Sequence, residues 1–510
     1  MLFVAMDSCK EVLEVEPPGF ATAEGFYKTA EDIQVGINGI YQVFQGDVWG
    51  GAFVHIQPHF EAVTENAVIC CQWEYGIEAI ARGTMSPTTG SLVSWKWEFG
   101  YAAITRINQI LDAMENGGIS MTDDQKSKFI AEVRFLRAYV YSDMSFLYGD
   151  LPLILKPITN DEAKQLERTP KAEVVAQVLS DLDFAASNLA TTPYNDQWGR
   201  PTKQAALFLK GKVLLYNQRF AEAADVFQQV IDMEGGAVGL DDNYESLFRG
   251  TNEQSKEILF SIQYLSQTQG LGEGSFLMVH YAPTNLDGTP ASSGWGWGSL
   301  HYTRSLLDDY YMSDGLPITS SPLYDEDNLF DNRDPRFKMT FFVPGSVYRT
   351  VTLTEDNFKV NGGTPKVPMT TKKWVTETDT NPEQSSADLI LMRYADALLM
   401  YAEARNEASG PDASVYEAVN KVRARAGMPD FPTGLSQEAM RNEIRHERKI
   451  EFMMEGHRYF DLLRWRTAET VIPSITADDT RAFDPAKNYL WPIPQSTIDN
   501  NPKIVQNPNY

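Results

Sequence analysis

Residues 445–465, RHERKIEFMMEGHRYFDLLRW, contain two histidines, three glutamates and an aspartate, side chains suited to metal or acid–base chemistry. Zinc proteases use H-E-x-x-H, which places two imidazoles one helical turn apart so that both reach one ion. His446 and Glu447 begin such a motif, but Ile450 occupies the position of the second histidine. His457 lies eleven residues after His446, which is roughly 16 Å along an unbroken helix. One ion cannot bind both imidazoles, and this stretch predicts no metal site.

The rest of the sequence offers no other catalytic or cofactor motif. His55 and His59 have the i,i+4 spacing of a metal-binding pair, but Pro58 between them opposes a regular helix. A G-x-S-x-G elbow, a phosphate loop, a Cys/His dyad and a dinucleotide fingerprint are all missing from the sequence. We therefore expect no metal, no cofactor and no catalytic residues.

Paired carboxylates are the second chemistry that this stretch could support, because glycoside hydrolases place two of them across a sugar. Glu447, Glu451 and Glu455 line one helical face at i,i+4 spacing. Arg448 and Arg458 lie three residues from Glu451 and Glu455, the interval at which opposite charges pair on a helix. A nearby arginine lowers a carboxyl pKa, whereas a general acid needs a raised one. A structural ion-pair ladder is the preferred interpretation, and an all-helical secreted glycoside hydrolase is the alternative.

The composition excludes some classes of partner. The chain has 510 residues, 43% of them hydrophobic, which is enough for a large core. Lys and Arg number 44 against 69 Asp and Glu, and the formal charge of −25 repels nucleic-acid phosphates and anionic lipids. No apolar run reaches the ~18 residues that a membrane-spanning helix needs. Nucleic acid is therefore not an expected partner.

Helical periodicity predicts three helical blocks, at about 30–45, 97–232 and 388–465. Residues 46–96 and 235–386 are instead rich in Gly, Pro, Asn, Ser and Asp, which predicts long loops with short strands such as 257–264. Residues 1–20 lack periodicity and predict a tether. We expect one domain over residues 21–510, in which the helical blocks support the loop-rich part.

An internal repeat is visible in KQAALFLKGKVLLYNQRFAEAADVFQQVID, residues 203–232. Gly211 in the first helix and Ala223 in the second are small enough to let the two helices approach closely, and the A-x3-F step from Ala223 to Phe227 matches the tetratricopeptide pattern. Residues 388–409 and 414–427 predict a second helix pair, and residues 171–190 a further helix. The predicted architecture is a mainly α, tetratricopeptide-like repeat scaffold.

The stretch ERKIEFMMEGHRYFDLLRW resembles the C-terminal signature of the SusD/RagB family, glycan-binding lipoproteins of polysaccharide-utilisation systems in Gram-negative bacteria. Four further segments resemble the same family: EVRFLRAYVYSDMSFLYGDLPLIL from Glu132, DNRDPRF from Asp331, LMRYADALLMYAEARN from Leu391, and the C-terminal YLWPIPQSTIDNNPKIVQNPNY. The resemblance covers nearly the whole chain. It implies a SusD-like helical scaffold with loop and short-strand insertions, on which irregular loops bind an oligo- or polysaccharide without catalysis.

The resemblance also implies a partner and a location. The partner would be a SusC-like TonB-dependent outer-membrane barrel, which the protein covers like a lid. The lipid-anchored cysteine of the family corresponds to Cys9, so that membrane contact is expected through a lipid anchor only, at the cell surface of the outer membrane. The preceding MLFVAMDS is too short for a secretory signal and is interpreted as a signal remnant, although Asp7 departs from a normal lipobox. An incidental cysteine in an unstructured N-terminus is the alternative.

Sugar rings present apolar faces edged with hydroxyls, so a glycan site needs exposed aromatic rings beside hydrogen-bonding groups. Two loop segments supply both, and the candidate glycan-binding residues are Trp73, Tyr75, Tyr281, Asn285, Asp287, Trp295, Trp297 and Tyr302. The alternative for any one ring is that it closes a loop core. Trp97 and Tyr101 are assigned to packing and Trp465 and Trp491 to the scaffold. A repeat scaffold that binds only protein is a third possible function.

Overall fold

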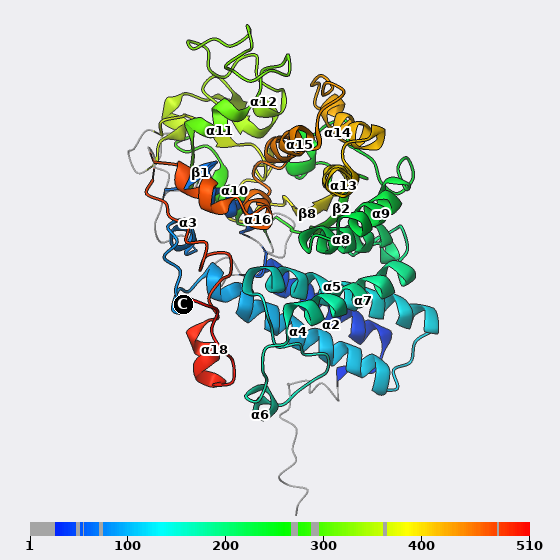
Figure 1. Ribbon diagram of the computed structural model, residues 1–510. Coiled ribbons are helices and arrows are strands. Elements are labelled where there is room, and N and C mark those ends of the chain that lie inside the picture. The colour runs from blue at the N-terminus through cyan, green and yellow to red at the C-terminus, as the bar shows by residue number, and fades with distance from the viewer. Residues whose placement is uncertain are drawn as a thin grey trace, which may run out of the picture.

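The computed structural model describes residues 26–46, 52–54, 56–70, 75–266, 274–286, 295–360, 365–476 and 479–510. Long helices dominate it (Figure 1). They are α2 (Ala30–Gln45), α4 (Leu92–Asn116), α5 (Asp123–Tyr148), α7 (Lys171–Asn188), α8 (Lys203–Tyr216), α9 (Phe220–Ile231), α13 (Tyr394–Ser409), α14 (Ala413–Arg425) and α15 (Gln437–Glu451). The predicted mainly α fold is confirmed, and α2 coincides with the first predicted helical block.

Successive long helices pack against one another. The packing order is α2 on α4, α4 on α5, α5 on α7, α7 on α8, α8 on α9, α9 on α13, and α13 on both α14 and α15. The α8–α9 pair depends on Gly211, because a Cβ atom at this position would lie 2.8 Å from Cε1 of Phe227. Only glycine permits this approach without a shift of the aromatic ring. The close contact predicted from the repeat pattern is confirmed.

Several helices begin at side-chain caps that the sequence encodes. Thr29 and Asp32 form a capping box at α2, and Thr122 and Gln125 form another at α5. Asp412 caps α14 by accepting hydrogen bonds from two backbone N–H groups of its first turn. Such caps satisfy backbone donors that have no partner within the helix, and they define where each helix begins.

Short helices and two-stranded ladders make up the loop-rich part. The short helices are α3 (Ile77–Ala81), α6 (Asn160–Ala163), α10 (Leu277–Tyr281), α11 (Arg304–Asp309), α12 (Arg336–Thr340), α16 (Arg458–Arg464), α17 (Ala468–Val471) and α18 (Gln495–Asn500), with 3-10 turns such as η2 (Gln57–Val63). The strands are β1 (Ala67–Ile69), β2 (Ile258–Ile262), β3 (Leu300–Tyr302), β4 (Phe341–Phe342), β5 (Val347–Tyr348), β6 (Val351–Thr352), β7 (Thr370–Thr371) and β8 (Leu389–Arg393). Among the described residues these strands pair antiparallel: β1 with β3, β2 with β8, β4 with β7 and β5 with β6.

Two predicted boundaries are wrong. The third helical block was expected from residue 388, but residues 389–393 form β8, which is buried along its whole length and pairs with β2. Consecutive apolar residues fit a doubly buried strand as well as a helix, so periodicity alone does not separate the two. The second block begins at Leu92 rather than at residue 97. The predicted strand at 257–264 is confirmed as β2.

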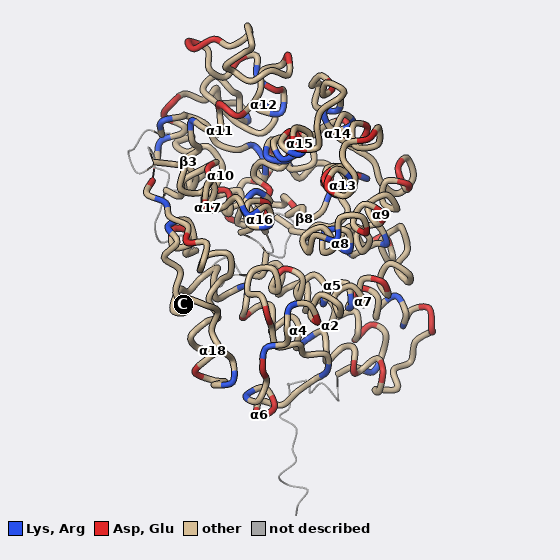
Figure 2. The backbone as a smooth tube through the Cα atoms, in the orientation of Figure 1, with Lys and Arg blue, Asp and Glu red and all other residues tan. Residues whose placement is uncertain are grey.

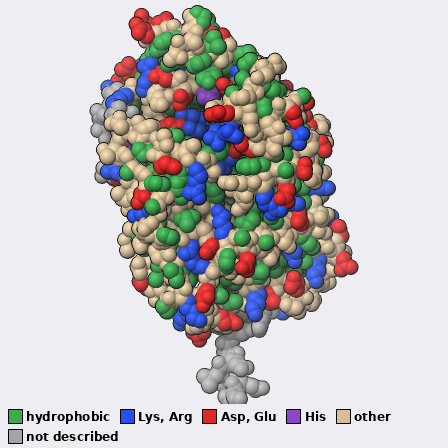
Figure 3. Space-filling model, in the orientation of Figure 1, with side chains coloured by type: hydrophobic (Ala, Val, Ile, Leu, Met, Phe, Trp, Pro, Cys, Tyr) green, Lys and Arg blue, Asp and Glu red, His purple; other side chains and the backbone are tan. Residues whose placement is uncertain are grey.

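Side chains from the helical scaffold and the loop-rich part share one hydrophobic core. Leu209 of α8, Leu399 of α13 and Leu462 of α16 belong to the same buried cluster as Tyr281 and Tyr302 of the loop-rich part. None of the described helices combines the length and apolarity that a bilayer crossing requires. On the face shown in Figure 3, acidic and basic side chains are interspersed. The core therefore ties the loops that carry the candidate site to the helices.

Candidate functional site

The three glutamates of the C-terminal stretch lie inside the protein. Helix α15 ends at Glu451, a turn follows in which Gly456 has a φ of 76°, and α16 begins at Arg458. Glu447 and Glu455 are each 1% exposed and Glu451 is 0% exposed. An acid–base pair acting on a polysaccharide must face solvent, so this burial opposes a catalytic role.

Each of these carboxylates is neutralised by cations from other segments. Figure 2 shows basic and acidic residues gathered around α15 and α16. The contacts to the first two glutamates are Glu447 with Arg336 at 2.5 Å and Arg423 at 2.9 Å, and Glu451 with Arg336 at 2.8 Å, Arg393 at 2.7 Å and Arg425. Glu455 contacts Lys373 at 2.6 Å and Arg393 at 2.8 Å. The cations come from α12, β8, α14 and the segment after β7, so the cluster ties these elements to α15.

The electrostatics of the cluster favour charged carboxylates. Burial by itself would raise the pKa of Glu451, but Arg425, Arg393 and Arg336 outweigh burial and hold this pKa well below its ordinary value. The pKa of Glu455 is lowered in the same way, since Arg393 and Lys373 together outweigh burial. A general acid needs the opposite shift. The interpretation of the stretch as structural ion pairs is confirmed.

The predicted partners within the stretch are wrong. Arg448 pairs with Asp396 at 2.6 Å and Asp461 at 3.0 Å, not with Glu451. Arg458 pairs with Glu65 at 2.7 Å, not with Glu455. Pairing at i,i+3 describes side chains that lie along an exposed helix surface. Here the residues are buried and face different neighbours, and the turn at Gly456 separates Glu455 from Arg458.

The histidines of the stretch lie in different surroundings. His446 stacks on Tyr311 with ring centroids 4.0 Å apart, and its Nε2 lies 2.8 Å from the backbone oxygen of Asp309. His457 is buried with its Nδ1 atom 3.9 Å from Asp396. Within the described ranges, no group of three or more His, Cys, Asp or Glu side chains is arranged to hold a metal ion.

Aromatic side chains from separate segments meet around His280 of α10. Tyr75 precedes α3, and its hydroxyl lies 3.0 Å from Nε2 of His280. Trp297, in the loop before β3, packs edge-on against the His280 ring with centroids 5.0 Å apart, and Trp95 of α4 lies 5.8 Å from Tyr75. His280 is buried, whereas the other three rings are half-buried. We call Tyr75, Trp95 and Trp297 the aromatic rim.

The rim is held by backbone and side-chain contacts beneath it. The backbone N–H of Trp297 donates to the carbonyl oxygen of Val279, and Nδ1 of His280 lies 2.8 Å from the Ser299 hydroxyl. Gly296 permits the approach, because a Cβ atom there would lie 1.7 Å from the Ala282 carbonyl oxygen. The rim is therefore a set of rings on a fixed support, and such rings lose little conformational entropy when they bind a flat ligand.

Tyr281 and Tyr302 are not exposed aromatic platforms, and this part of the prediction is wrong. Tyr281 is 1% exposed and Tyr302 is 3% exposed. The Tyr281 hydroxyl lies 2.7 Å from Nδ1 of His59, and the Tyr302 hydroxyl donates to the sulfur of Met454 at 3.2 Å. Both rings close the loop core with their polar ends satisfied, which was the stated alternative.

Other predicted residues make contacts of their own or lie beyond the described part of the chain. Trp295 is half-buried, and the guanidinium of Arg349 lies 4.3 Å from its ring centroid. The side-chain amide of Asn285 donates to the backbone oxygen of Asp356 at 2.9 Å. Trp73, Asp287 and Cys9 lie outside the described residues.

Trp95 and His280 belong to this aromatic cluster but were not among the predicted residues, although the sequence holds a signal for Trp95. Residues two positions apart on a helix are separated by about 200° around its axis, so Trp95 and Trp97 point to opposite faces of α4. Trp97 is 4% exposed, as its assignment to packing requires, which leaves Trp95 on the more accessible face. His280 gave no signal, because its role depends on rings from distant segments. Trp491 is fully buried, as its assignment to the scaffold predicts.

Comparison with known proteins agrees with this architecture. Residues 256–510 match the family described as "SusD family", and residues 14–215 match "Starch-binding associating with outer membrane". SusD-like protein P25 of Formosa agariphila is 27% identical, over 98% of this chain and 95% of its own length. The Starch-binding protein SusD of Bacteroides thetaiotaomicron is 24% identical over 88% of this chain and 84% of its own.

Solved structures give the same fold. A SusD-like carbohydrate binding protein from Bacteroides fragilis superposes with a TM-score of 0.81 at 25% identity, covering 94% of this chain and 99% of that one. Surface glycan-binding protein A from Bacteroides thetaiotaomicron, in complex with laminarihexaose, superposes with a TM-score of 0.74 at 20% identity, covering 95% and 100%. The chain belongs to the SusD family. Members of this family are non-catalytic glycan-binding proteins, in agreement with the prediction that the chain is not an enzyme.

Proposed function

We propose that this protein captures a neutral oligo- or polysaccharide on the aromatic rim and holds it without cleaving it. The observation that carries the proposal is the convergence of Tyr75, Trp95 and Trp297, from three separate segments, around the buried His280. Half-buried rings keep part of their surface accessible, and the apolar face of a pyranose stacks on an accessible aromatic ring. The buried carboxylates at the C-terminus, in contrast, are saturated by arginine and lysine.

Hydrogen-bonding groups for the sugar hydroxyls come from the segments that flank the rim. Trp73 lies two residues before Tyr75 in the sequence, and Asp287 lies between Asn285 and Trp295. We include Trp73, Asn285, Asp287 and Trp295 as further contacts of a long glycan. Their support is proximity in sequence to the rim and a chemistry that suits sugar hydroxyls.

We further propose that the captured glycan is delivered to a SusC-like TonB-dependent transporter in the outer membrane. The support is membership of the SusD family and the match of residues 14–215 to a family described as associating with the outer membrane. In this proposal Cys9 carries the lipid anchor, residues 1–20 form the tether, and residues 21–510 form one domain at the cell surface. A single acyl chain holds only reversibly, so stable anchoring needs a second acyl chain or a protein partner.

A glycan array followed by isothermal titration tests capture on the rim. Oligosaccharides that bind on the array are titrated into the wild type and into Trp297→Ala. Loss of an aromatic anchor is expected to weaken binding by about 1–3 kcal/mol. Trp198→Ala is the matched control, because Trp198 is 40% exposed and lies in the loop before α8, outside the rim. Unchanged affinity of Trp297→Ala would remove this ring from the site.

The two alternative functions predict different results in assays of the same purified protein. A glycoside hydrolase would release reducing ends from a polysaccharide panel, and one carboxylate substitution would abolish the turnover. A scaffold that binds only protein would migrate unretarded in gels that contain soluble glycans. Retardation without release of reducing ends is the expected result.

A further inference from the structure

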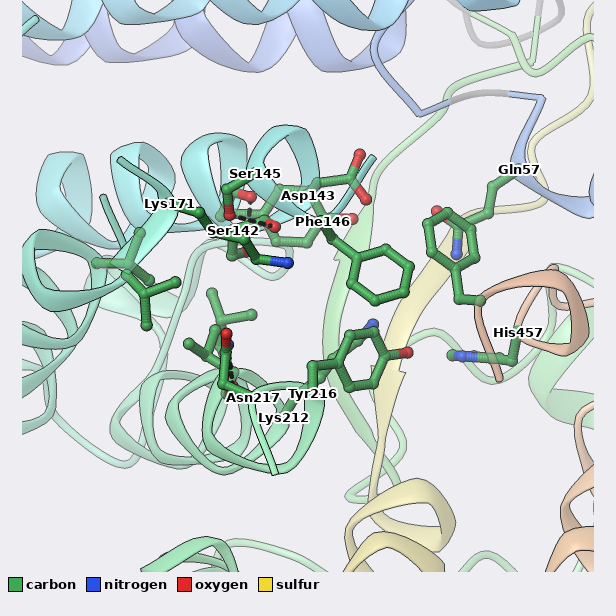
Figure 4. A pocket seen from close by; sticks show the side chains of 16 residues that line it. Gln57, Ser142, Asp143, Ser145, Phe146, Lys171, Lys212, Tyr216, Asn217 and His457 are labelled. Carbon is green, nitrogen blue, oxygen red and sulfur yellow. Dashed lines mark hydrogen bonds between the residues drawn. The ribbon is translucent and has the colours of Figure 1, made fainter. Parts of the chain in front are cut away.

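A small cavity lies between the helical scaffold and the C-terminal stretch, away from the aromatic rim. Its volume is about 50 Å³, and its walls are formed by α5, α7, α8, the first residue of η2 and the start of α16. Figure 4 shows Lys171 and His457 entering this space from opposite sides, with Phe146 and Tyr216 beside them. Elements far apart in sequence therefore meet at this point.

Two lysine ammonium groups line the cavity, and carboxylates act on both without forming an ion pair: Asp150 on Lys171, and Asp396, Asp143 and Asp461 on Lys212. Lys171 begins α7 and Lys212 lies on α8, and neither forms an ion pair or a side-chain hydrogen bond within the described residues. Their nearest defined contacts are aromatic: Nζ of Lys171 lies 5.5 Å from the Phe146 ring centroid and Nζ of Lys212 lies 5.4 Å from that of Tyr216. Burial lowers the pKa of both lysines and outweighs the effect of these carboxylates.

The Tyr216 hydroxyl adds an unsatisfied donor. Its oxygen is buried and has no hydrogen-bond partner among the described residues. A buried hydroxyl without a partner costs about 1–3 kcal/mol, so a missing partner is expected. The amide of Asn217 lines the same space and uses one of its hydrogens on the Val213 carbonyl oxygen. The cavity therefore contains hydrogen-bond donors and positive charges that the protein's own groups do not pair.

Asp143 itself lines the cavity, and the carboxylates that act on Lys212 each pair with another cation, Asp461 with Arg448 and Arg464. Asp143 accepts from Lys96 at 2.7 Å, and Asp396 accepts from Arg448 at 2.6 Å. His457 adds no charge near neutral pH, because burial lowers its pKa to about 4. Lys171 and Lys212 thus remain as a net positive pair that faces a shared space.

We infer that this cavity is a binding site for a small tetrahedral oxyanion, such as inorganic phosphate or sulfate. A water needs about 10–15 Å³ of such space, so 50 Å³ accommodates on the order of four waters. A central atom with four oxygens fits this space, and a sugar ring does not. The Lys171 ammonium approaches from α7, and the Lys212 ammonium, the Tyr216 phenol and the Asn217 amide approach from α8 and its C-terminal end. Several donors of this kind suit an ion with several acceptor oxygens.

The site has a structural consequence. Lys171 and Lys212 belong to neighbouring helices of the scaffold, and His457 belongs to the turn that precedes α16. A bound oxyanion bridges these elements and stabilises the folded state in proportion to its occupancy. The inference does not rest on glycan binding, because the cavity and the aromatic rim share no residue.

Titration with sodium phosphate, sodium sulfate and sodium chloride, by calorimetry and by thermal unfolding, tests the inference. With phosphate or sulfate at about 100 times Kd, the unfolding midpoint is expected to rise by about 2–4 °C. Lys212→Met is expected to weaken binding about 10- to 100-fold, since it removes a charged hydrogen-bond donor. Tyr216→Phe, which removes only one hydroxyl, is expected to weaken binding about fivefold to tenfold.

Lys210→Met is the matched control, because Lys210 lies on the same helix and pairs with Asp183 at the surface. Phosphate and sulfate affinity should be unchanged in this variant. The inference is overturned if the wild type shows neither binding heat nor a midpoint shift with phosphate and sulfate. It is also overturned if chloride acts equally well at the same ionic strength, or if Lys212→Met and Tyr216→Phe both bind like the wild type.

Discussion

Glu451 is the carboxylate on which Arg336, Arg393 and Arg425 converge, and Glu451→Gln tests whether this cluster holds the fold together. The side chain is 0% exposed, and its oxygens lie 2.8 Å from Nη1 of Arg336 and 2.7 Å from Nη1 of Arg393. Glutamine keeps the size and shape of glutamate but lacks the negative charge. The variant therefore leaves buried guanidinium groups without full compensation.

The expected loss of stability is large. Removing one partner from a buried ion pair costs about 3–5 kcal/mol, because the remaining charge stays in a poorly solvated place. Folded proteins have a free energy of unfolding of about 5–15 kcal/mol, so the variant loses a substantial part of it. Chemical denaturation followed by far-ultraviolet circular dichroism measures the change as a lower midpoint at an unchanged slope.

The same substitution changes the response to acid. Burial would raise the pKa of Glu451, but the arginines hold it well below the ordinary value, so Glu451 is charged in the folded protein down to strongly acidic pH. A carboxylate with a lowered pKa stabilises the fold above its unfolded pKa of about 4.3, and this contribution is lost as the pH falls further. When the pH is lowered from 7 into the acidic range, the free energy of unfolding of Glu451→Gln should therefore fall less than that of the wild type.

Asp161→Asn is the control for Glu451→Gln. Asp161 pairs with Lys164 at 3.4 Å on the surface, where both side chains are mostly exposed. Such pairs contribute little, so no measurable change is expected. A Glu451→Gln protein that unfolds at the wild-type midpoint would refute the structural role of the cluster. Loss of glycan affinity in a correctly folded Glu451→Gln protein would argue instead for a role in binding.

Three further substitutions test other contacts. Arg458→Ala removes the guanidinium that lies 2.7 Å from Glu65 and should lower the free energy of unfolding by about 1.5–3 kcal/mol. Glycan affinity, measured by isothermal titration, should stay unchanged. Weaker glycan binding in the folded variant would contradict a purely structural role. Gly211→Ala places a Cβ atom 2.8 Å from the Phe227 ring and should lower the free energy of unfolding by about 1–3 kcal/mol. Adding Phe227→Leu in a double-mutant cycle should restore part of this loss. Additive effects of the two substitutions would refute the clash. Burial raises the pKa of Glu61 to about 7, so the free energy of unfolding falls as the pH rises from about 4.5 to 7. Glu61→Gln should therefore raise the free energy of unfolding by up to about 3 kcal/mol above pH 7 and leave it unchanged near pH 4. An equal increase at both pH values would exclude titration of Glu61 as the cause.

Local sequence patterns were sufficient for the helical scaffold. The α8–α9 pair follows from apolar spacing and from the small side chain of Gly211, features that act over one or two helical turns. The arginines among the C-terminal carboxylates predicted structural ion pairs there, but the cations that bind Glu447, Glu451 and Glu455 come from other segments. The start of α13 did not follow, because the apolar run of β8 is compatible with a helix until its pairing with β2 is known.

By itself, the sequence determined a mainly α repeat scaffold, a loop-rich insertion and a C-terminal stretch dedicated to ion pairing, because periodicity and charge spacing are local properties. Only the tertiary structure decided which partners the charges take: Arg458 meets Glu65, which is 393 positions away along the chain. It also decided that Tyr281 and Tyr302 are core residues while Tyr75, Trp95 and Trp297 form a rim. Whether a ring is buried depends on what packs against it, and those neighbours come from distant segments that no local pattern specifies.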